Sequence, residues 1–563
     1  MHMSDVIQIL LYAVALIVLG WPLGKFLANV LEGRKTFLSR PFGWLERLIY
    51  KLCGVLPQQE MHWKQYTGAV IWFNLFSFLI VFILQLAQQW LPLNPQNLSN
   101  TSWHLAFNTA VSFMTNTNWQ SYAGETTLSY LTQMLGLTVQ NFVSAATAVG
   151  VLVALIRGIR GQTVSTIGNF WVDLTRSTVY VLIPLSIVFA VFLVSQGVVQ
   201  TFSPAAKTTT LEGTEQVIPL GPAASQIAIK QLGTNGGGFY NANSAHPLEN
   251  PTPIANYFEM LALLLLPVAF VIGFGRMLGS NRHARVLLIV MFILWASGLA
   301  ASLWAEYGAN EAIHQAQMLE GKETRFGIVN SIIWSVSTTC ASNGSVNAMH
   351  SSLSPIAGGI AMFNIMLGEI VFGGVGCGVY GMVLFALMTV FLAGLMVGRT
   401  PEYFGKKIEA FEMKMVIVGI LAPSAAMVVL AGIASVIPAG LSSLANKGPH
   451  GLSEILYAYA SGVGNNGSAF AGLNANTPWY NVTIGLAMLI GRFAVLIPVL
   501  AIAGSLGAKK ISPPSPGTFA TDTPMFGILL IGVILIVGAL TFFPALSLGP
   551  IIEHFLMGGG TSF

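Results

Sequence analysis

Four short polar segments of similar composition recur along the chain, and each follows a short apolar stretch. They read Thr115-Asn116-Thr117-Asn118, Thr234-Asn235-Gly236-Gly237, Ser342-Asn343-Gly344-Ser345 and Asn465-Asn466-Gly467-Ser468. Successive matching asparagines in these segments lie 119, 108 and 123 residues apart. Small polar loops placed four times in an apolar chain predict four strands of backbone around one axis. In such an arrangement carbonyl oxygens replace the water around a cation.

The residue types in these loops suit a carbonyl-lined filter. Successive oxygens that point inward force some residues out of the usual backbone conformations, which glycine adopts freely and asparagine tolerates. Gly236, Gly344 and Gly467 meet this need, and Thr117 is expected at the matching position of the first loop. One Asn-Gly pair alone would indicate a tight turn. Four loops at similar spacing, each after an apolar stretch, favour a filter.

The chemistry of the loops indicates which cation they suit. The acidic residue nearest to them is Glu125, so no ring of carboxylates is expected. Calcium and magnesium favour carboxylate ligands, whereas neutral oxygens suit a large, weakly hydrated monovalent ion. Potassium is therefore favoured over divalent ions, and sodium stays open.

The composition predicts a membrane protein that positions these loops between spanning helices. Hydrophobic residues make up 54% of the chain and charged residues 8%, against about 25% charged in soluble domains. A span needs about 20 apolar residues. Ten stretches qualify: 5–30, 66–91, 130–156, 178–200, 255–278, 284–305, 359–398, 413–438, 482–507 and 524–548.

Four shorter apolar stretches, at 102–115, 222–234, 328–341 and 452–464, lie between the spans and lead into the loops. They are too short to cross a bilayer and predict re-entrant half-helices. The order span, half-helix, loop, span therefore repeats four times. The predicted fold is all-α, with ten transmembrane helices and four pore half-helices in four pseudo-symmetric channel-like repeats. The predicted boundaries are 1–65 for an anchor helix and cytoplasmic loop, 66–160, 161–280, 281–412 and 413–510 for the repeats, and 511–563 for a last helix.

The basic residues predict the orientation. Lysine and arginine gather in alternate loops, at 31–65, 157–176, 276–285, 399–414 and 509–510. Basic loops stay cytoplasmic, so both termini and all four polar loops should lie outside. The repeats would then run parallel around one axis, whereas inverted repeats would place related loops on opposite sides.

One predicted span, 359–398, is about twice the usual length and is rich in glycine. Glycine weakens a helix interior by about 1 kcal/mol relative to alanine, and broken backbone at membrane depth must line a cavity or be buried. An intramembrane loop that obstructs the inner pore below the filter is predicted; close helix packing through small residues is the alternative. The glycines are Gly368, Gly373, Gly374, Gly376, Gly378 and Gly381.

Glu369 and Arg492 are charged residues that fall well inside predicted spans. Glu369 lies at the start of the predicted break, and Arg492 lies near the middle of its span. An intramembrane charge needs a partner or water. The two are therefore predicted to lie near each other below the filter, either as part of the ion path or as a structural ion pair.

The segments 114–122, 233–247, 339–348 and 461–472 closely resemble the potassium-binding A subunit family of the bacterial Kdp potassium-transporting P-type ATPases. The resemblance spans essentially the whole chain and implies a member of the superfamily of potassium transporters built from four fused channel-like units. It implies that Gln120 lies near the selectivity site and that the glycine-rich region after Gly368 is an intramembrane loop. The filter positions it implies are Thr115, Asn116, Thr117, Thr234, Asn235, Gly236, Ser342, Asn343, Gly344, Asn465, Asn466 and Gly467.

The resemblance further implies an ATP-driven potassium uptake complex in the bacterial inner membrane, with a catalytic P-type ATPase subunit, a single-span C subunit and a small F-type subunit. The sequence itself contains no Asp-Lys-Thr-Gly phosphorylation motif and no Walker loop, so ATP hydrolysis is expected on another chain and no catalytic residue or nucleotide site is expected here. Potassium would be the transported ligand. Two alternatives stay open: a stand-alone potassium channel or ion-coupled transporter, and a binding and assembly subunit that does not conduct.

Overall fold

The computed structural model describes residues 3–308, 318–398, 400–513 and 519–561. In this part of the chain, ten helical segments are long and apolar enough to cross a membrane, as predicted. They are Met3–Leu31 (α1), Trp63–Trp90 (α3, Trp63–Ala87, and η1, Gln88–Trp90), Thr132–Arg160 (η2, Thr132–Thr138, and α6, Val139–Arg160), Phe170–Ser195 (α7, Phe170–Arg176, η3, Ser177–Leu182, and α8, Ile183–Ser195), Pro253–Leu278 (α10), Asn281–Tyr307 (α11), Cys377–Met396 (within α14, Cys377–Val397), Ala410–Ala434 (α15), Pro478–Ala508 (α18) and Pro524–Gly558 (α19, Pro524–Leu546, η6, Ser547–Ile551, and α20, Ile552–Gly558).

Four shorter helices lie between the spans, and each overlaps one predicted half-helix. They are α4 (Trp103–Met114), α9 (Ala223–Leu232), α12 (Gly327–Cys340) and α17 (Gly448–Gly464). The helix α17 begins four residues before the predicted start because Pro449 is accommodated in its first turn, where a missing N–H is harmless. The remaining short elements are α2 (Ser39–Cys53), α5 (Gly124–Thr127), η4 (Asn243–Ala245), η5 (His350–Ser352), α13 (Pro355–Met366), α16 (Pro438–Leu441) and the strands β1 (Ala206–Thr209), β2 (Glu215–Ile218), β3 (Glu402–Tyr403) and β4 (Lys406–Lys407).

Three spans begin with the same Thr-Pro pair, which explains where they start. The side chains of Thr252, Thr477 and Thr523 each accept a hydrogen bond from the backbone N–H three residues later. The proline that follows supplies the fixed φ of a first helical turn. These local signals fix where the last span begins and where the helices after the second and fourth loops begin.

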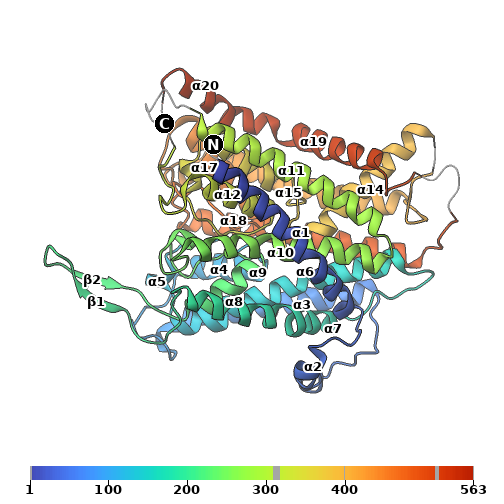
Figure 1. The fold of residues 1–563 in the computed structure, drawn as a ribbon, viewed down its shortest axis with the longest axis horizontal. Coiled ribbons are helices and arrows are strands. Elements are labelled where there is room, and N and C mark those ends of the chain that lie inside the picture. The colour runs from blue at the N-terminus through green and yellow to red at the C-terminus, as the bar shows by residue number, and fades with distance from the viewer. Residues whose placement is uncertain (1–2, 309–317, 399, 514–518, 562–563) are drawn as a thin grey trace.

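The helices form one bundle, and the spans near its centre are the most buried. The spans α10 and α6 are almost wholly enclosed, and α18 packs against α6, α15, α17 and α4. The first and last spans lie at the periphery, α1 along α10 and α19 against α11 and α14. In Figure 1, α19 runs along the top edge of the bundle and α1 crosses the bundle diagonally.

The half-helices share one end of the molecule. In Figure 1 the labels of α4, α12 and α17 lie on the side that carries both termini and the antiparallel β1–β2 hairpin, the label of α9 lies near the centre, and α2 lies at the bottom, to the right of them. This arrangement fits parallel repeats and not inverted ones. Arg399, one of the residues predicted on the basic side, lies outside the described residues.

Candidate cation-binding site

Each half-helix runs directly into one of the four polar loops. The loops are enclosed by the bundle: of the twelve predicted filter residues only Gly467 is more than marginally exposed. The C-terminal end of a helix carries a partial negative charge because its last carbonyls lack intrahelical partners. Four such ends directed at one region favour a cation there.

Backbone hydrogen bonds align the four loops and correct one predicted match. In every loop one residue donates its N–H to the carbonyl five residues earlier on the half-helix. The bonds are Thr117 N to Ser112 O (2.9 Å), Asn235 N to Lys230 O (2.9 Å), Asn343 N to Thr338 O (3.1 Å) and Asn466 N to Ser461 O (2.9 Å). Thr117 therefore matches the asparagines of the other loops, and the prediction that it matches their glycines is wrong.

The backbone conformation of the residue before each of these four N–H donors supports the same alignment. Asn116, Thr234, Ser342 and Asn465 all have left-handed backbone, with φ of 67°, 50°, 55° and 56°. Asn118, with φ of 58°, takes the place of Gly236 and Gly467. The prediction matched loops by their asparagines, whereas the end of each half-helix fixes where the loop begins.

Thr115 consequently lies one position before the first loop, and not at its first position as predicted. Its hydroxyl donates to Val111 O at 2.9 Å and lies 2.7 Å from the hydroxyl of Thr117. It supports the first loop from the end of α4, and the loop positions proper are Asn116, Thr117 and Asn118.

The loops bond to one another in a closed ring. One contact joins each loop to the next in chain order, and a fourth joins the last to the first. The contacts are Asn116 Nδ2 to Thr234 O (3.1 Å), Gly344 N to Asn235 O (3.1 Å), Ser342 Oγ to Asn465 O (3.0 Å) and Asn465 Nδ2 to Thr117 Oγ1 (2.9 Å). The four segments are thus brought together around one axis.

Two glycines are required by how closely the loops approach. A Cβ on Gly236 would lie 2.0 Å from Gly344 N, and one on Gly467 would lie 2.0 Å from Thr117 O. Both glycines also have positive φ, at 91° and 95°. No other residue type fits without moving the neighbouring loop.

The predicted break in 359–398 is confirmed. The helix α13 ends at Met366 and α14 begins at Cys377. Glu369 and Phe372 have left-handed backbone within the break, as do Gly368, Gly373 and Gly376. Gly378, predicted within the break, lies in the first turn of α14.

The break touches the ring from one side. Val375 N donates to Thr234 Oγ1 at 2.9 Å, and Gly373 N donates to Cys340 O at 3.1 Å. At Gly374 an added Cβ would lie 3.1 Å from Thr234 Oγ1. The loop 367–376 therefore lies directly against the second and third polar loops, where the sequence placed it.

The ring lies between two open volumes. On one side an entrance of about 530 Å³ is lined by Asn118, Gln120, Gly344 and Gly467, among others. On the other side a cavity of about 100 Å³ is lined by Ser342 and by residues of the break. An ion that passes the ring would enter this inner cavity.

Glu369 and Arg492 both line the inner cavity, so their predicted proximity is confirmed. Arg492 is a buried residue of α18. Its guanidinium Nη2 donates to Ser144 O at 3.1 Å, and the Ser144 hydroxyl donates to Asn116 Oδ1 at 2.7 Å. Arg492 is thereby linked to the first loop as well as to the cavity.

Gln120 lies at the entrance, and its amide binds both the backbone N–H and the backbone carbonyl of one residue that follows the second loop, Gly238. Its Nε2 donates to Gly238 O and its Oε1 accepts from Gly238 N, each at 2.9 Å. This residue joins the first loop to the second, next to the ring, where the resemblance placed it.

Several supporting residues were missed from the sequence. Ser144 and Asn243 carry no signal that distinguishes them from other polar residues. Asn118 is the last residue of the first segment and was passed over because the loops were matched by their asparagines. Lys230 did carry a signal, since a charged residue inside an apolar half-helix needs a partner.

Within the described residues, no group of three or more His, Cys, Asp or Glu side chains could hold a metal ion. Oxygen ligands for a cation at the ring would come from backbone carbonyls and from the hydroxyl and amide side chains of the loops. Such neutral ligands can select a monovalent ion.

Comparison with known proteins gives the family. The model for the potassium-transporting ATPase A subunit family matches residues 10–555. The potassium-transporting ATPase potassium-binding subunits of Pseudomonas entomophila and Herpetosiphon aurantiacus are each 56% identical to this chain, over 99% and 98% of it and 100% and 99% of their own lengths. The crystal structure of the potassium transporter TrkH from Vibrio parahaemolyticus has a similar fold, with a TM-score of 0.50 over 88% of this chain and 98% of that one at 14% identity. The chain belongs to the potassium-transporting ATPase A subunit family.

Proposed function

We propose that this chain binds potassium from outside the cell in the ring of four polar loops and passes it to an ATP-hydrolysing partner. The observation that carries the proposal is the closed ring, in which Asn465 and Thr117 complete a circuit of hydrogen bonds. A closed ring can hold oxygens at a fixed spacing, which suits an ion that has lost its water. The names of the relatives support potassium as that ion.

The loop between α13 and α14 serves in this proposal as the inner barrier. It lies against the ring, so an ion cannot leave straight down without moving it. The inner cavity, lined by Glu369 and Arg492, is the path on which the ion leaves toward a partner. This arrangement favours a pump subunit over a stand-alone open channel.

The partners in the proposal are the catalytic P-type ATPase subunit, a single-span C subunit and a small F-type subunit in a bacterial inner membrane. Both termini face outward, as does the entrance, because the basic loops stay cytoplasmic. The repeats are 66–160, 161–280, 281–412 and 413–510.

Transport in liposomes tests the proposal. The assembled complex should take up potassium only with ATP, and the isolated chain should conduct little. Rapid potassium flux from the isolated chain would instead establish a passive channel.

A glycine substitution tests whether the ring binds the ion. Gly236→Ala should weaken the apparent potassium affinity of the complex because the added Cβ would overlap Gly344 N. Gly532→Ala, in α19 with no atom within 4 Å of the added Cβ, is the matched control. An unchanged affinity in Gly236→Ala would show that the chain is a scaffold.

Arg492→Gln tests the inner cavity. The proposal predicts a slower transport rate with potassium affinity changed less, because Arg492 lies beyond the ring. Unchanged rate and affinity would leave Arg492 with a structural role only.

A further inference from the structure

A lysine occupies a position in the second half-helix where the other three have a hydroxyl. The backbone carbonyl of Lys230 accepts a hydrogen bond from the N–H of a loop residue, and so do the carbonyls of Ser112, Thr338 and Ser461. Their side chains also bond to the loop directly: Ser112 Oγ donates to Trp119 O, Thr338 Oγ1 donates to Ser345 O, and Ser461 Oγ accepts from Gly467 N, at 2.8–2.9 Å. Lys230 is too long for such a direct contact.

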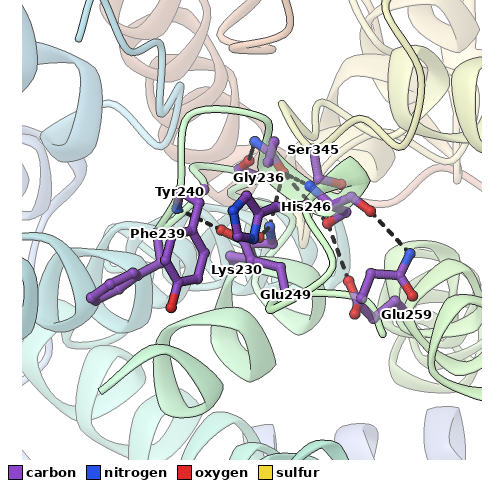
Figure 2. A network of polar contacts seen from close by, with 12 residues as sticks. Lys230, Gly236, Phe239, Tyr240, His246, Glu249, Glu259 and Ser345 are labelled. Atoms are coloured by element: carbon purple, nitrogen blue, oxygen red, sulfur yellow. Dashed lines mark hydrogen bonds and ion pairs between the residues drawn. The ribbon is translucent and has the colours of Figure 1, made fainter. Parts of the chain in front are cut away.

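Lys230 reaches its loop through an intermediate residue. Its Nζ donates to Asn243 Oδ1 at 2.8 Å and pairs with the Glu249 carboxylate. Asn243 Nδ2 donates to Gly236 O at 2.7 Å, and Glu249 Oε1 accepts from Tyr240 N at 2.8 Å. Figure 2 shows Lys230 and Glu249 together beside the loop that carries Gly236.

The ammonium helps to fix the orientation of the Asn243 amide. Oδ1 of Asn243 accepts from Lys230 Nζ and from Ser244 N, each at 2.8 Å, so Nδ2 faces Gly236 O. The side chains of Lys230 and Glu249 are fully buried, so water does not compete for these bonds. The orientation of the Gly236 carbonyl is therefore set by a chain of buried contacts that begins at Glu249.

The second loop needs such a restraint more than the others. Gly236, Gly237 and Gly238 follow one another, and consecutive glycines allow peptide units to rotate at little cost. At the equivalent places the other loops continue with larger residues, such as Trp119 and Ser345. Side-chain amides bind the glycine run at both ends, Asn243 at Gly236 and Gln120 at Gly238.

The charge balance fits this positioning role. An unpaired ammonium so close to the ring would repel a bound cation in a medium of low dielectric constant. Glu249 neutralises Lys230, so the pair itself adds no net charge while keeping a strong, oriented donor. Buried ion pairs contribute little net stability compared with apolar residues, so stability alone does not account for one here.

We propose that Lys230 is a positioning residue for ion selection. Paired with Glu249, it acts through Asn243 to hold the Gly236 carbonyl in one orientation, so that the ring does not adapt to sodium. This inference rests on the proposed potassium-binding function of the ring.

Two variants of the assembled complex test the proposal. Asn243→Gly removes the amide that contacts Gly236 and keeps the backbone favourable, since Asn243 has φ of 54°. Lys230→Met/Glu249→Gln removes both charges of the pair together. Measurements are the apparent affinities for potassium and sodium in ATP hydrolysis, the maximal rate, and the melting temperature of the complex.

Both variants should lose about tenfold in preference for potassium over sodium, the change expected for one lost buried hydrogen bond. The maximal rate should change much less. Glu306→Gln/Lys322→Met is the matched control, because Glu306 and Lys322 form another fully buried pair, 2.8 Å apart. It should leave the ion preference unchanged, and its melting temperature shows whether the complex is folded.

The outcomes separate the inference from the proposed function. Unchanged ion preference in a folded Asn243→Gly complex overturns the positioning role, as does an equal change of preference in the control. A wild-type complex that does not prefer potassium overturns the proposed function itself. Should one variant fail to assemble, the other gives the same measurement, since the two remove different parts of the chain of contacts.

Discussion

Asn465 donates from Nδ2 to the hydroxyl of Thr117 at 2.9 Å, although 348 residues separate the two in the sequence. The same amide nitrogen donates to Met488 O at 3.0 Å, so the Asn465 side chain is fixed by α18 as well. This contact joins the fourth loop to the first. Without it the four loops would form an open chain of contacts instead of a ring.

Removal of this contact should weaken potassium binding. Thr117→Val keeps the shape of the side chain and leaves the buried Asn465 amide with one partner fewer, at a cost of about 1–3 kcal/mol. We expect apparent potassium affinity to fall by about tenfold, because 1.4 kcal/mol corresponds to a factor of ten. Potassium-dependent ATP hydrolysis by the assembled complex measures it.

A control for that experiment is Thr541→Val. The hydroxyl of Thr541 donates to Val537 O within α19, far from the ring in the sequence and on a peripheral span. Equal losses of affinity in Thr117→Val and Thr541→Val would contradict a special role for ring closure.

The corrected alignment of the first loop gives a prediction at Asn118. This residue has positive φ and matches the glycines of the other loops, so Asn118→Gly should preserve potassium affinity. Thr117→Gly should lower it because the Thr117 hydroxyl is lost from the ring. If Thr117→Gly were tolerated and Asn118→Gly were not, the alignment by asparagines would be right and the alignment by hydrogen bonds wrong.

The intramembrane loop should respond differently at two of its glycines. Gly368 and Gly373 both have positive φ, which costs about 1–3 kcal/mol for another residue. An added Cβ at Gly368 meets no atom within 4 Å, whereas at Gly373 it would lie 2.1 Å from Gly378 Cα. Gly373→Ala should therefore lose roughly a further 1–3 kcal/mol through overpacking.

The melting temperature of the complex and its rate of potassium uptake measure this difference. We expect Gly373→Ala to lower both well below the values of Gly368→Ala. Similar behaviour of the two variants would mean that the loop rearranges easily and is not held against the ring.

Acidification should destabilise the segment before α10 through His246. Burial lowers the pKa of His246 below its ordinary value, although nearby carboxylates such as Glu249 act in the opposite direction. Its ring stacks on Tyr240 at 4.2 Å, and its Nδ1 accepts from Leu248 N at 3.1 Å, which requires an unprotonated nitrogen. The folded state therefore binds a proton less readily than the unfolded chain.

The sign of the pH effect follows from this difference. The stabilisation is complete above about pH 6.5, the ordinary pKa of histidine, and is lost as the pH falls through the lowered pKa of the folded state. The melting temperature of the wild-type complex should fall more between pH 7.5 and 5.5 than that of His246→Gln, whose side chain stays neutral. Equal falls would show that other groups dominate the acid response.

The sequence by itself determined the membrane class, the number of spans and the four half-helices, because these depend on local composition and length. It also located the intramembrane break, since clustered glycines weaken a helix wherever it lies. The positions of the polar loops followed from their residue types.

The tertiary structure decided how the loops match and what holds them. Thr117, and not Asn116, occupies the position in the first loop that Asn235 occupies in the second, because the end of α4 fixes where the first loop begins. The bond from Asn465 to Thr117 joins the fourth loop to the first, and the chain from Glu249 through Lys230 and Asn243 to Gly236 joins α9 to the segment that follows it. Such contacts depend on the distances between side chains after packing, and the spacing of residues along a chain does not contain those distances.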